Sequence, residues 1–238
     1  MRGLVLRKTK LKESDLIVEL LSDEGSLVRA VAKGARKPKS SFASRLELGN
    51  SVELLCAPSR GLSIVQECRM GSARMGLRSD YDKLLCAEAA LELLSKCAQE
   101  DLPQPKLLAA SEAGLDCLAA APAEKATAIF AAMFLKTLAF VGLRPELRCC
   151  VLCGAPLENP VRFSDFDGGA VCPDCARETQ TRVFAPGVLP TAAFLLHNPY
   201  SAIAANDYDP TSIDDVLSIA QALAKTHLDI GLKSLRLL

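Results

Sequence analysis

Four cysteines are arranged in two pairs whose spacing is typical of metal ligands. Cys150 and Cys153 form one C-x-x-C, Cys172 and Cys175 form a second, and 18 residues separate the two pairs. Two thiolates three positions apart on a tight turn can bind one ion, and a second such turn completes a tetrahedron of sulfur ligands. The pattern predicts one metal ion held by all four thiolates.

The ligand set indicates the metal and its role. Four thiolates suit zinc and also iron, but nothing in the sequence indicates redox work, so we expect one Zn²⁺. Four protein ligands leave no position open for water, and such an ion stabilises the fold rather than taking part in chemistry. Cys149 could replace Cys150 as a ligand in a C-x3-C pattern, but we favour Cys150. The other five cysteines lie among apolar neighbours and are expected to be buried thiols: Cys56, Cys68, Cys86, Cys97 and Cys117.

A second cluster of functional side chains is cationic. The stretch VAKGARKPKSSF, residues 31–42, carries Lys33, Arg36, Lys37 and Lys39 within seven positions and no acidic residue. Like charges at this spacing repel, so the run is either a solvated loop or a surface that binds an anion. Residues 1–45 hold 11 Lys+Arg against 5 Asp+Glu, whereas the rest of the chain holds 17 against 23. A net charge of zero therefore conceals a basic N-terminal part, which favours a polyanionic partner.

The first 70 residues contain the short runs of branched residues that are typical of strands. Five such runs follow one another with no intervening helical pattern, which predicts a five-stranded OB-type barrel over residues 1–79. The cationic run then falls in the connection between the third and fourth strands. Further cations precede it in the first strand region and follow it, at Arg7, Lys8, Lys10, Lys12 and Arg45.

From about residue 80 the apolar residues recur at helical spacing, and we expect an all-α domain over residues 80–238. Helices are predicted near 80–98, 106–120, 123–141 and 212–228, with starts marked by Ser79 and by Ser212. His227 lies on an apolar stripe and is expected in the core. The cysteine segment, residues 148–177, interrupts this domain as a zinc-ribbon-like insertion. The fold class is therefore α+β.

Neither a signal peptide nor a membrane span is expected. The N-terminus returns to charge after four residues, and the uncharged run 183–206 is broken by three prolines. We therefore expect a protein of the cytoplasm. No catalytic motif is present either: the chain has only two histidines, and neither stands in the H-x-E pattern of a zinc deaminase. We expect a protein that is not an enzyme.

The scarcity of aromatic residues shapes the expected mode of binding. Phe42 is the single aromatic residue among the first 80, and the chain has no Trp. Proteins that bind single-stranded nucleic acids usually stack the bases on aromatic rings. If this barrel binds a nucleic acid, it is therefore expected to do so mainly through the phosphates. The affinity of such binding depends steeply on salt concentration and only weakly on base sequence, and both single and double strands can bind.

The order of these parts resembles the bacterial recombination mediator family RecO. VAKGARKPKSSF followed by LELGNSVELL resembles its N-terminal barrel, GLRPELRCCVLCG and RFSDFDGGAVCPDC resemble its zinc insertion, and HLDIGLKS resembles its last helix. The second motif places Cys150 at the ligand position. The resemblance implies a nonenzymatic DNA-repair protein that binds single- and double-stranded DNA. It also implies that the protein anneals strands coated with single-strand-binding protein and contacts the C-terminal tail of that protein. With RecR, it would help to load RecA onto DNA at the nucleoid.

The resemblance also implies which residues bind DNA. They are the cations of the barrel, with the loop residues first: Lys33, Arg36, Lys37, Lys39, Arg7, Lys8, Lys10 and Arg45. Ser41 stands where the family pattern has a cation, so the surface is weaker by one charge. Two other functions stay open: a zinc-ribbon RNA-binding or translation-associated protein, and an interaction scaffold whose basic loop binds an acidic protein.

Overall fold

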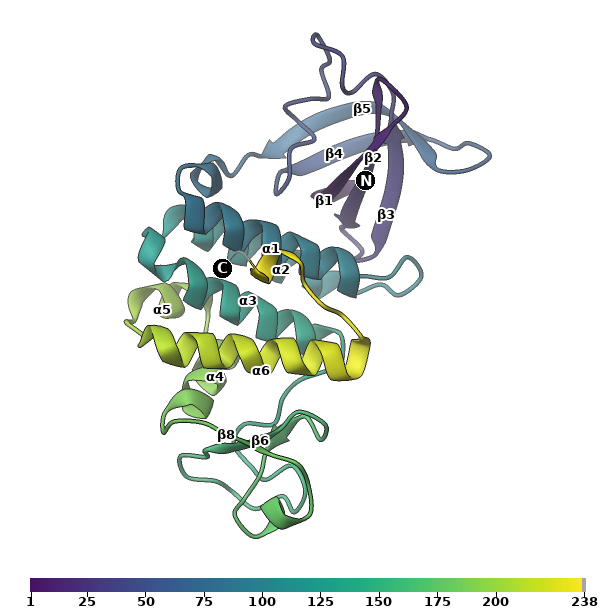
Figure 1. The fold of residues 1–238 in the computed structure, drawn as a ribbon. Coiled ribbons are helices and arrows are strands. Elements are labelled where there is room, and N and C mark those ends of the chain that lie inside the picture. The colour runs from purple at the N-terminus through teal and green to yellow at the C-terminus, as the bar shows by residue number, and fades with distance from the viewer. Residues whose placement is uncertain (237–238) are drawn as a thin grey trace.

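The computed structural model describes residues 1–236 of the 238-residue chain. A β-barrel lies at one end of the molecule, a layer of helices lies in the middle, and a small cysteine-containing module lies at the far end (Figure 1). The predicted α+β organisation, a five-stranded barrel followed by helices that carry a four-cysteine insertion, is confirmed.

The barrel closes in the order β1-β2-β3-β5-β4. Its neighbours are antiparallel except β3 and β5, which pair in parallel at Ala30–Ser63 and Val31–Ile64. Alternate side chains such as Val18, Leu20 and Val52 fill the interior. The strands are β1 (Arg2–Leu11), β2 (Asp15–Ser22), β3 (Leu27–Ala32), β4 (Ser51–Ala57) and β5 (Ser63–Ser72).

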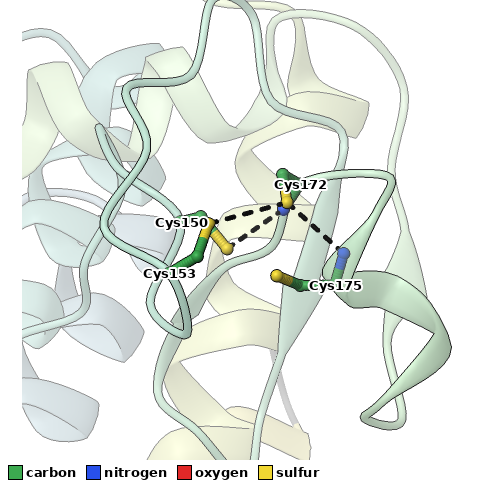
Figure 2. Close-up of side chains that lie close together, drawn as sticks. All are labelled: Cys150, Cys153, Cys172 and Cys175. Carbon is green, nitrogen blue, oxygen red and sulfur yellow. Dashed lines mark hydrogen bonds between the residues drawn. The ribbon is translucent and has the colours of Figure 1, made fainter.

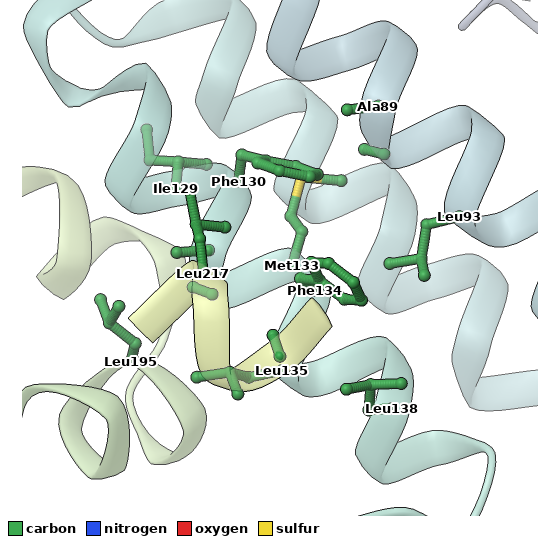
Figure 3. Close-up of a cluster of buried hydrophobic side chains, with 14 of the residues drawn as sticks. Ala89, Leu93, Ile129, Phe130, Met133, Phe134, Leu135, Leu138, Leu195 and Leu217 are labelled. Atoms are coloured by element: carbon green, nitrogen blue, oxygen red, sulfur yellow. The ribbon is translucent and has the colours of Figure 1, made fainter. Parts of the chain in front are cut away.

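The helical layer is built around α3, which is apolar on every side. Such a helix is stable only when it is surrounded, and α3 packs against α1, α2, α4 and α6. The helices are α1 (Tyr81–Cys97), α2 (Pro105–Ala120), α3 (Ala126–Phe140), α4 (Val188–His197), α5 (Tyr200–Ala205) and α6 (Pro210–Leu228). Figure 3 shows this core, with residues of α3 between those of α1, α4 and α6: Ile129, Phe130, Met133, Phe134, Leu135, Leu138, Ala89, Leu93, Leu195 and Leu217.

One charged residue of α3 has a structural role that its sequence neighbours do not indicate. The Lys136 ammonium donates hydrogen bonds to the carbonyl oxygens of Leu196 and Asn198, both at 2.8 Å. These carbonyls belong to the C-terminal end of α4, where oxygens have no partner within the helix. Burial lowers the pKa of Lys136. A cation thus stabilises a helix terminus inside the core.

The structure corrects several details of the expected helices. Asp80, not Ser79, caps α1 by accepting hydrogen bonds from the N–H groups of Asp82 and Lys83, and Asp209, not Ser212, caps α6. The uncharged run 183–206 contains α4 and α5. Pro190 lies in the first turn of α4, and Pro199 directly precedes α5. His227 is exposed, not buried, and its Nε2 lies 2.9 Å from the carbonyl oxygen of Asp165.

The cysteine module is a three-stranded sheet with short strands, β6 (Arg162–Ser164) between β7 (Gly169–Ala170) and β8 (Arg182–Val183). Phe163 is fully buried in the helical core and fixes the module to it. Four 3-10 turns complete the described elements: η1 (Met75–Arg78), η2 (Ala123–Lys125), η3 (Cys175–Arg177) and η4 (Ser234–Arg236). None of the helices in residues 1–236 has the length and apolar composition needed to cross a bilayer.

Barrel and helices share a seam that is apolar with a buried ionic centre. Leu4 and Leu21 of the barrel belong to the helical core. Beside them the Arg74 side chain, 4% exposed, donates to Asp116 at 2.6 Å and to the Gly49 carbonyl at 2.8 Å. The carboxylate of Glu112 lies 3.9 Å away and accepts from Ser51. The seam is therefore held by a buried guanidinium whose partners come from both parts.

Replacing Arg74 by Met is expected to lower the free energy of unfolding by about 2 kcal/mol, because the buried Gly49 carbonyl would lose its donor and Glu112 would depend on Arg2 alone among the cations of residues 1–236. The measurement is denaturant unfolding. Arg69→Met is the matched control, since the Arg69 side chain is 78% exposed and 3.8 Å from Glu67, and it should change stability by about 0.5 kcal/mol or less. Equal losses in the two variants would contradict the assignment.

The last described residues form a strap across α1. Glu92 of α1 accepts hydrogen bonds from the backbone N–H groups of Lys233 and Ser234 and from the Ser234 hydroxyl, and Lys96 lies 2.9 Å from it. Burial raises the pKa of Glu92, but these donors outweigh it and lower the pKa to about 2. The ionised form of Glu92 thus holds the strap in place.

The strap should loosen in acid. Because the folded pKa of Glu92 lies below its ordinary value of 4.5, its contribution is complete above about pH 4.5 and is lost as the pH falls towards 2. Hydrogen exchange of residues 229–236 should therefore accelerate across this window, and Glu92→Gln should show fast exchange already at pH 7. The contribution is roughly 3 kcal/mol at neutral pH. Glu88→Gln, on an exposed face of α1, should leave the exchange profile unchanged.

Candidate functional site

The cationic loop, residues 33–50, is bonded to the turn between β1 and β2. The Arg36 guanidinium donates to the carbonyl oxygens of Glu13 at 2.9 Å and Lys12 at 3.3 Å, and the Arg36 N–H donates to Ser14 at 2.9 Å. The Gly34 N–H donates to the Asp15 carboxylate at 2.8 Å. The first part of the loop, residues 33–40, and the turn therefore form one unit, which lies at the barrel end away from the helices (Figure 1), whereas Leu48 and Gly49 reach the seam.

This loop–turn unit is a strongly cationic surface. Lys33, Lys37 and Lys39 are exposed, and so are Lys10 near the end of β1 and Lys12 of the turn. Within residues 1–236, none of these five ammonium groups lies within 4 Å of a carboxylate. Their positive charge is available to an anion in solution.

The acidic residue of the turn is committed to holding the loop. The hydrogen bond from Gly34 is the main cause that lowers the pKa of Asp15, and the Ser14 hydroxyl, Lys12 and Lys33 add to it. Asp15 is therefore ionised at neutral pH and offsets one of the surrounding charges. Sequence analysis did not assign it this role, because its partner lies 19 residues away.

Three of the other predicted cations have partners within the barrel. Lys8 lies 2.8 Å from Glu47, and Arg45 donates to the carbonyl oxygen of Cys68 at 2.9 Å. Arg7 is 3.9 Å from Glu19, which is buried against α1, so Arg7 points to the helical side of the barrel. The exposed and unpaired part of the predicted set is thus Lys10, Lys33, Lys37 and Lys39, with Arg36 joining loop to turn.

The four predicted ligand cysteines converge at the other end of the molecule. The sulfur atoms of Cys150, Cys153, Cys172 and Cys175 all lie within 4.8 Å of one another, and Figure 2 shows the two pairs facing each other. Cys153 and Cys172 Sγ are 3.9 Å apart. Zinc–sulfur bonds of about 2.3 Å in a tetrahedron require sulfur atoms about 3.8 Å apart. The cluster therefore fits a tetrahedral thiolate-bound metal ion.

Backbone geometry prepares this cluster. After the first pair, Gly154 has a φ of 75° and its N–H donates to the Cys150 carbonyl at 2.8 Å, which closes a tight turn. The Val151 N–H donates to Ala170 at 2.8 Å and so brings the second pair alongside. Each turn is thus fixed by the main chain, and the side chains need little further ordering to bind an ion.

Backbone N–H donors favour the thiolate form of one of the four cysteines, Cys150, whereas neighbouring sulfur atoms raise the pKa of Cys153 and Cys175. The sulfur of Cys150 accepts the N–H of Cys172 at 3.4 Å. Burial raises the pKa of Cys150, but this and other backbone N–H donors outweigh it and lower the pKa to about 6. Cys149 is not part of the sulfur cluster, and its backbone pairs with that of Pro156 in an isolated antiparallel β-bridge. Four thiolates around one ion would leave no position for a substrate, so the chemistry that this geometry supports is structural.

Comparison with known proteins covers both parts of the chain. A family model described as Recombination protein O N terminal matches residues 1–73, and one described as Recombination protein O C terminal matches residues 78–236. The chain belongs to the RecO family. It is 34% identical over 246 residues to the DNA repair protein RecO of Anaeromyxobacter sp. strain K, covering 99% of this chain and 94% of that one. It is 32% identical to the DNA repair protein RecO of Bifidobacterium longum strain DJO10A, covering 99% and 96%.

Family membership joins the two sites in one DNA-repair protein. The basic loop–turn unit lies within the N-terminal RecO model, and the sulfur cluster lies within the C-terminal one. Both features that the sequence analysis singled out therefore belong to regions that define the family.

The sulfur cluster predicts a specific pattern of metal content. The purified protein and a Cys149→Ser variant should each carry about one metal ion per chain, whereas Cys150→Ser should lose most of it because only three thiolates remain. Elemental mass spectrometry measures the content. Chelation should also speed hydrogen exchange in residues 148–177, since the ion contributes to local folding. Metal lost from Cys149→Ser and kept by Cys150→Ser would reverse the ligand assignment.

Proposed function

We propose that this RecO family member is a nonenzymatic recombination mediator whose loop–turn unit binds the phosphates of single- and double-stranded DNA. The observation that supports the proposal is the group of exposed cations at Lys10, Lys12, Lys33, Lys37 and Lys39 on one end of a closed barrel. Phosphate contacts supply most of the affinity of such a surface and carry no sequence information.

The geometry supports a role in strand annealing. Two DNA strands repel each other through their phosphates, and a shared cationic surface reduces that repulsion while they pair. Contact through the backbone leaves most base edges free for Watson–Crick pairing. Because the loop is hydrogen-bonded to the β1–β2 turn, partly through Asp15, the lysines stay close together although none of the five ammonium groups is paired with a carboxylate within residues 1–236.

We further propose that the metal is zinc. The sulfur separation and the all-thiolate donor set support this choice, and the ion would be held by Cys150, Cys153, Cys172 and Cys175 as a structural centre. Iron in the same site would give visible absorbance from its thiolate bonds, so a coloured protein would contradict the assignment.

Three partner proteins belong to the proposal on the strength of family membership. They are RecR, the C-terminal tail of single-strand-binding protein, and RecA, which is loaded indirectly. In this picture the barrel binds DNA and the remaining surfaces are available to proteins. Its place of action would be the nucleoid.

Charge reversal at Lys37 and Lys39 tests the DNA surface. Both residues are exposed, and neither side chain has a hydrogen bond within residues 1–236, so Lys37→Glu/Lys39→Glu should fold normally. Its affinity for a labelled strand and for the duplex should fall at least tenfold, and the slope of log affinity against log salt should decrease by about two. Fluorescence anisotropy across a salt series measures both. Annealing of strands coated with single-strand-binding protein should slow in parallel.

Lys106→Glu/Lys233→Glu is the matched control, because it changes the net charge equally on exposed residues of the helical part. It should keep both affinity and salt slope. If DNA affinity were unchanged in the loop variant, the loop would not be the DNA surface, and an acidic protein would become the better candidate partner. Tighter binding of RNA than of DNA of matched form would favour the RNA-binding alternative.

A further inference from the structure

A groove of about 560 Å³ lies beside the cationic loop, between the loop and strand β5. It exists because β5 pairs with β3 only at its first two residues, Ser63 and Ile64, so the rest of that edge has no neighbouring strand. The loop covers this edge at a distance. The groove walls are Ser41, Phe42, Arg45, Gln66, Glu67 and Met70, with Cys68 and Arg69 completing them.

The groove is held open by contacts between loop and strand. The Arg45 guanidinium donates to the Cys68 carbonyl at 2.9 Å. The side-chain amide of Asn50 donates to the carbonyl oxygens of Ser44 and Arg45, both at 3.1 Å, and lies 3.4 Å from the sulfur of Met70. The two walls are therefore fixed relative to each other before any ligand arrives, which reduces the entropy lost on binding.

The walls combine apolar and polar groups in the way that a nucleobase requires. Phe42 is half-buried: part of it packs against the barrel core, and it also lines the groove. Met70, 41% exposed, supplies a second apolar surface. Gln66, Arg69 and Glu67 supply amide, guanidinium and carboxylate groups, which are the side chains that pair with base edges. Glu67 also disfavours a phosphate at this position.

We propose that this groove binds one unstacked base of a single strand whose phosphates run along the loop–turn unit. The proposal rests on the proposed function, because the loop must first hold the strand. Bases in a duplex are stacked and paired and cannot enter, so the groove adds affinity for single strands alone. One captured base anchors the strand and leaves its neighbours free to pair.

A β-strand from a protein partner is a poorer occupant of this groove. Strand addition needs the carbonyl and N–H groups of the open edge, and Arg45 already occupies the carbonyl of Cys68 in the middle of that edge. The continuity of the groove with the cationic loop also favours a chain that carries phosphates.

The test compares three probes on the full-length protein at one salt concentration: a mixed-sequence single strand, a strand of equal length made of abasic sites, and the duplex. The wild type should bind the normal strand about tenfold more tightly than the abasic strand, since stacking contributes affinity that phosphates cannot supply. In Phe42→Leu, which keeps an apolar side chain against the barrel core, this ratio should fall towards one. Affinity for the abasic strand and the duplex should stay unchanged.

Two further variants keep the result interpretable. Met70→Ala, at an exposed position, should reduce the same ratio and serves if Phe42→Leu is unstable. Leu55→Ala, an exposed apolar residue of β4 outside the groove, should keep the wild-type ratio. Equal affinity of the wild type for normal and abasic strands, or a ratio that survives both groove variants, would overturn the proposal. Failure of the phosphate surface itself would appear differently, as weak binding of all three probes.

Discussion

The mutual repulsion of the loop cations is the constraint on which the functional surface depends. Lysines this close lower their repulsion by spreading apart unless the main chain holds them. Here one end of the loop is bonded to the β1–β2 turn through Arg36 and Asp15, and the other end contacts β5 through Arg45 at the Cys68 carbonyl and through Asn50 at the Met70 sulfur. Arg36 and Arg45 are engaged in these bonds, and because the loop is held at both ends, the exposed lysines stay concentrated at the end of the barrel.

Features that depend on local period or spacing could be predicted from the sequence. Runs of branched residues without intervening helical patterns predicted the barrel, apolar residues at helical spacing predicted a helix near 123–141, and the doubled C-x-x-C predicted the sulfur cluster. In each case the pattern is set by residues a few positions apart, although the two C-x-x-C pairs are themselves separated by 18 residues. Such features can be predicted because the patterns that determine them are visible within short stretches of sequence.

Features that depend on a distant partner could not be predicted. The ion pair of Lys8 with Glu47 joins residues 39 positions apart, and no local pattern indicates it. Lys136 interrupts the most apolar helix because the carbonyl groups that it binds belong to α4. The groove under the loop needed the incomplete pairing of β3 with β5, which no pattern in either strand reveals. The number of charged residues follows from the sequence, but which of them form ion pairs within residues 1–236 follows only from the structure.

The barrel and the cysteine module, at opposite ends of the molecule, differ in how their small structures can be stabilised. The barrel closes on itself and shares an apolar seam with the helices, so burial alone can stabilise it. The cysteine module has very short strands, and its own buried cluster consists of Cys150, Val171 and Cys172, which is too little apolar surface for independent stability. Cross-linking by an ion bound to the four thiolates would compensate for that deficit. The four-cysteine cluster thus lies where the apolar core ends, and the exposed lysines lie at the opposite end, on a closed barrel with an apolar core of its own.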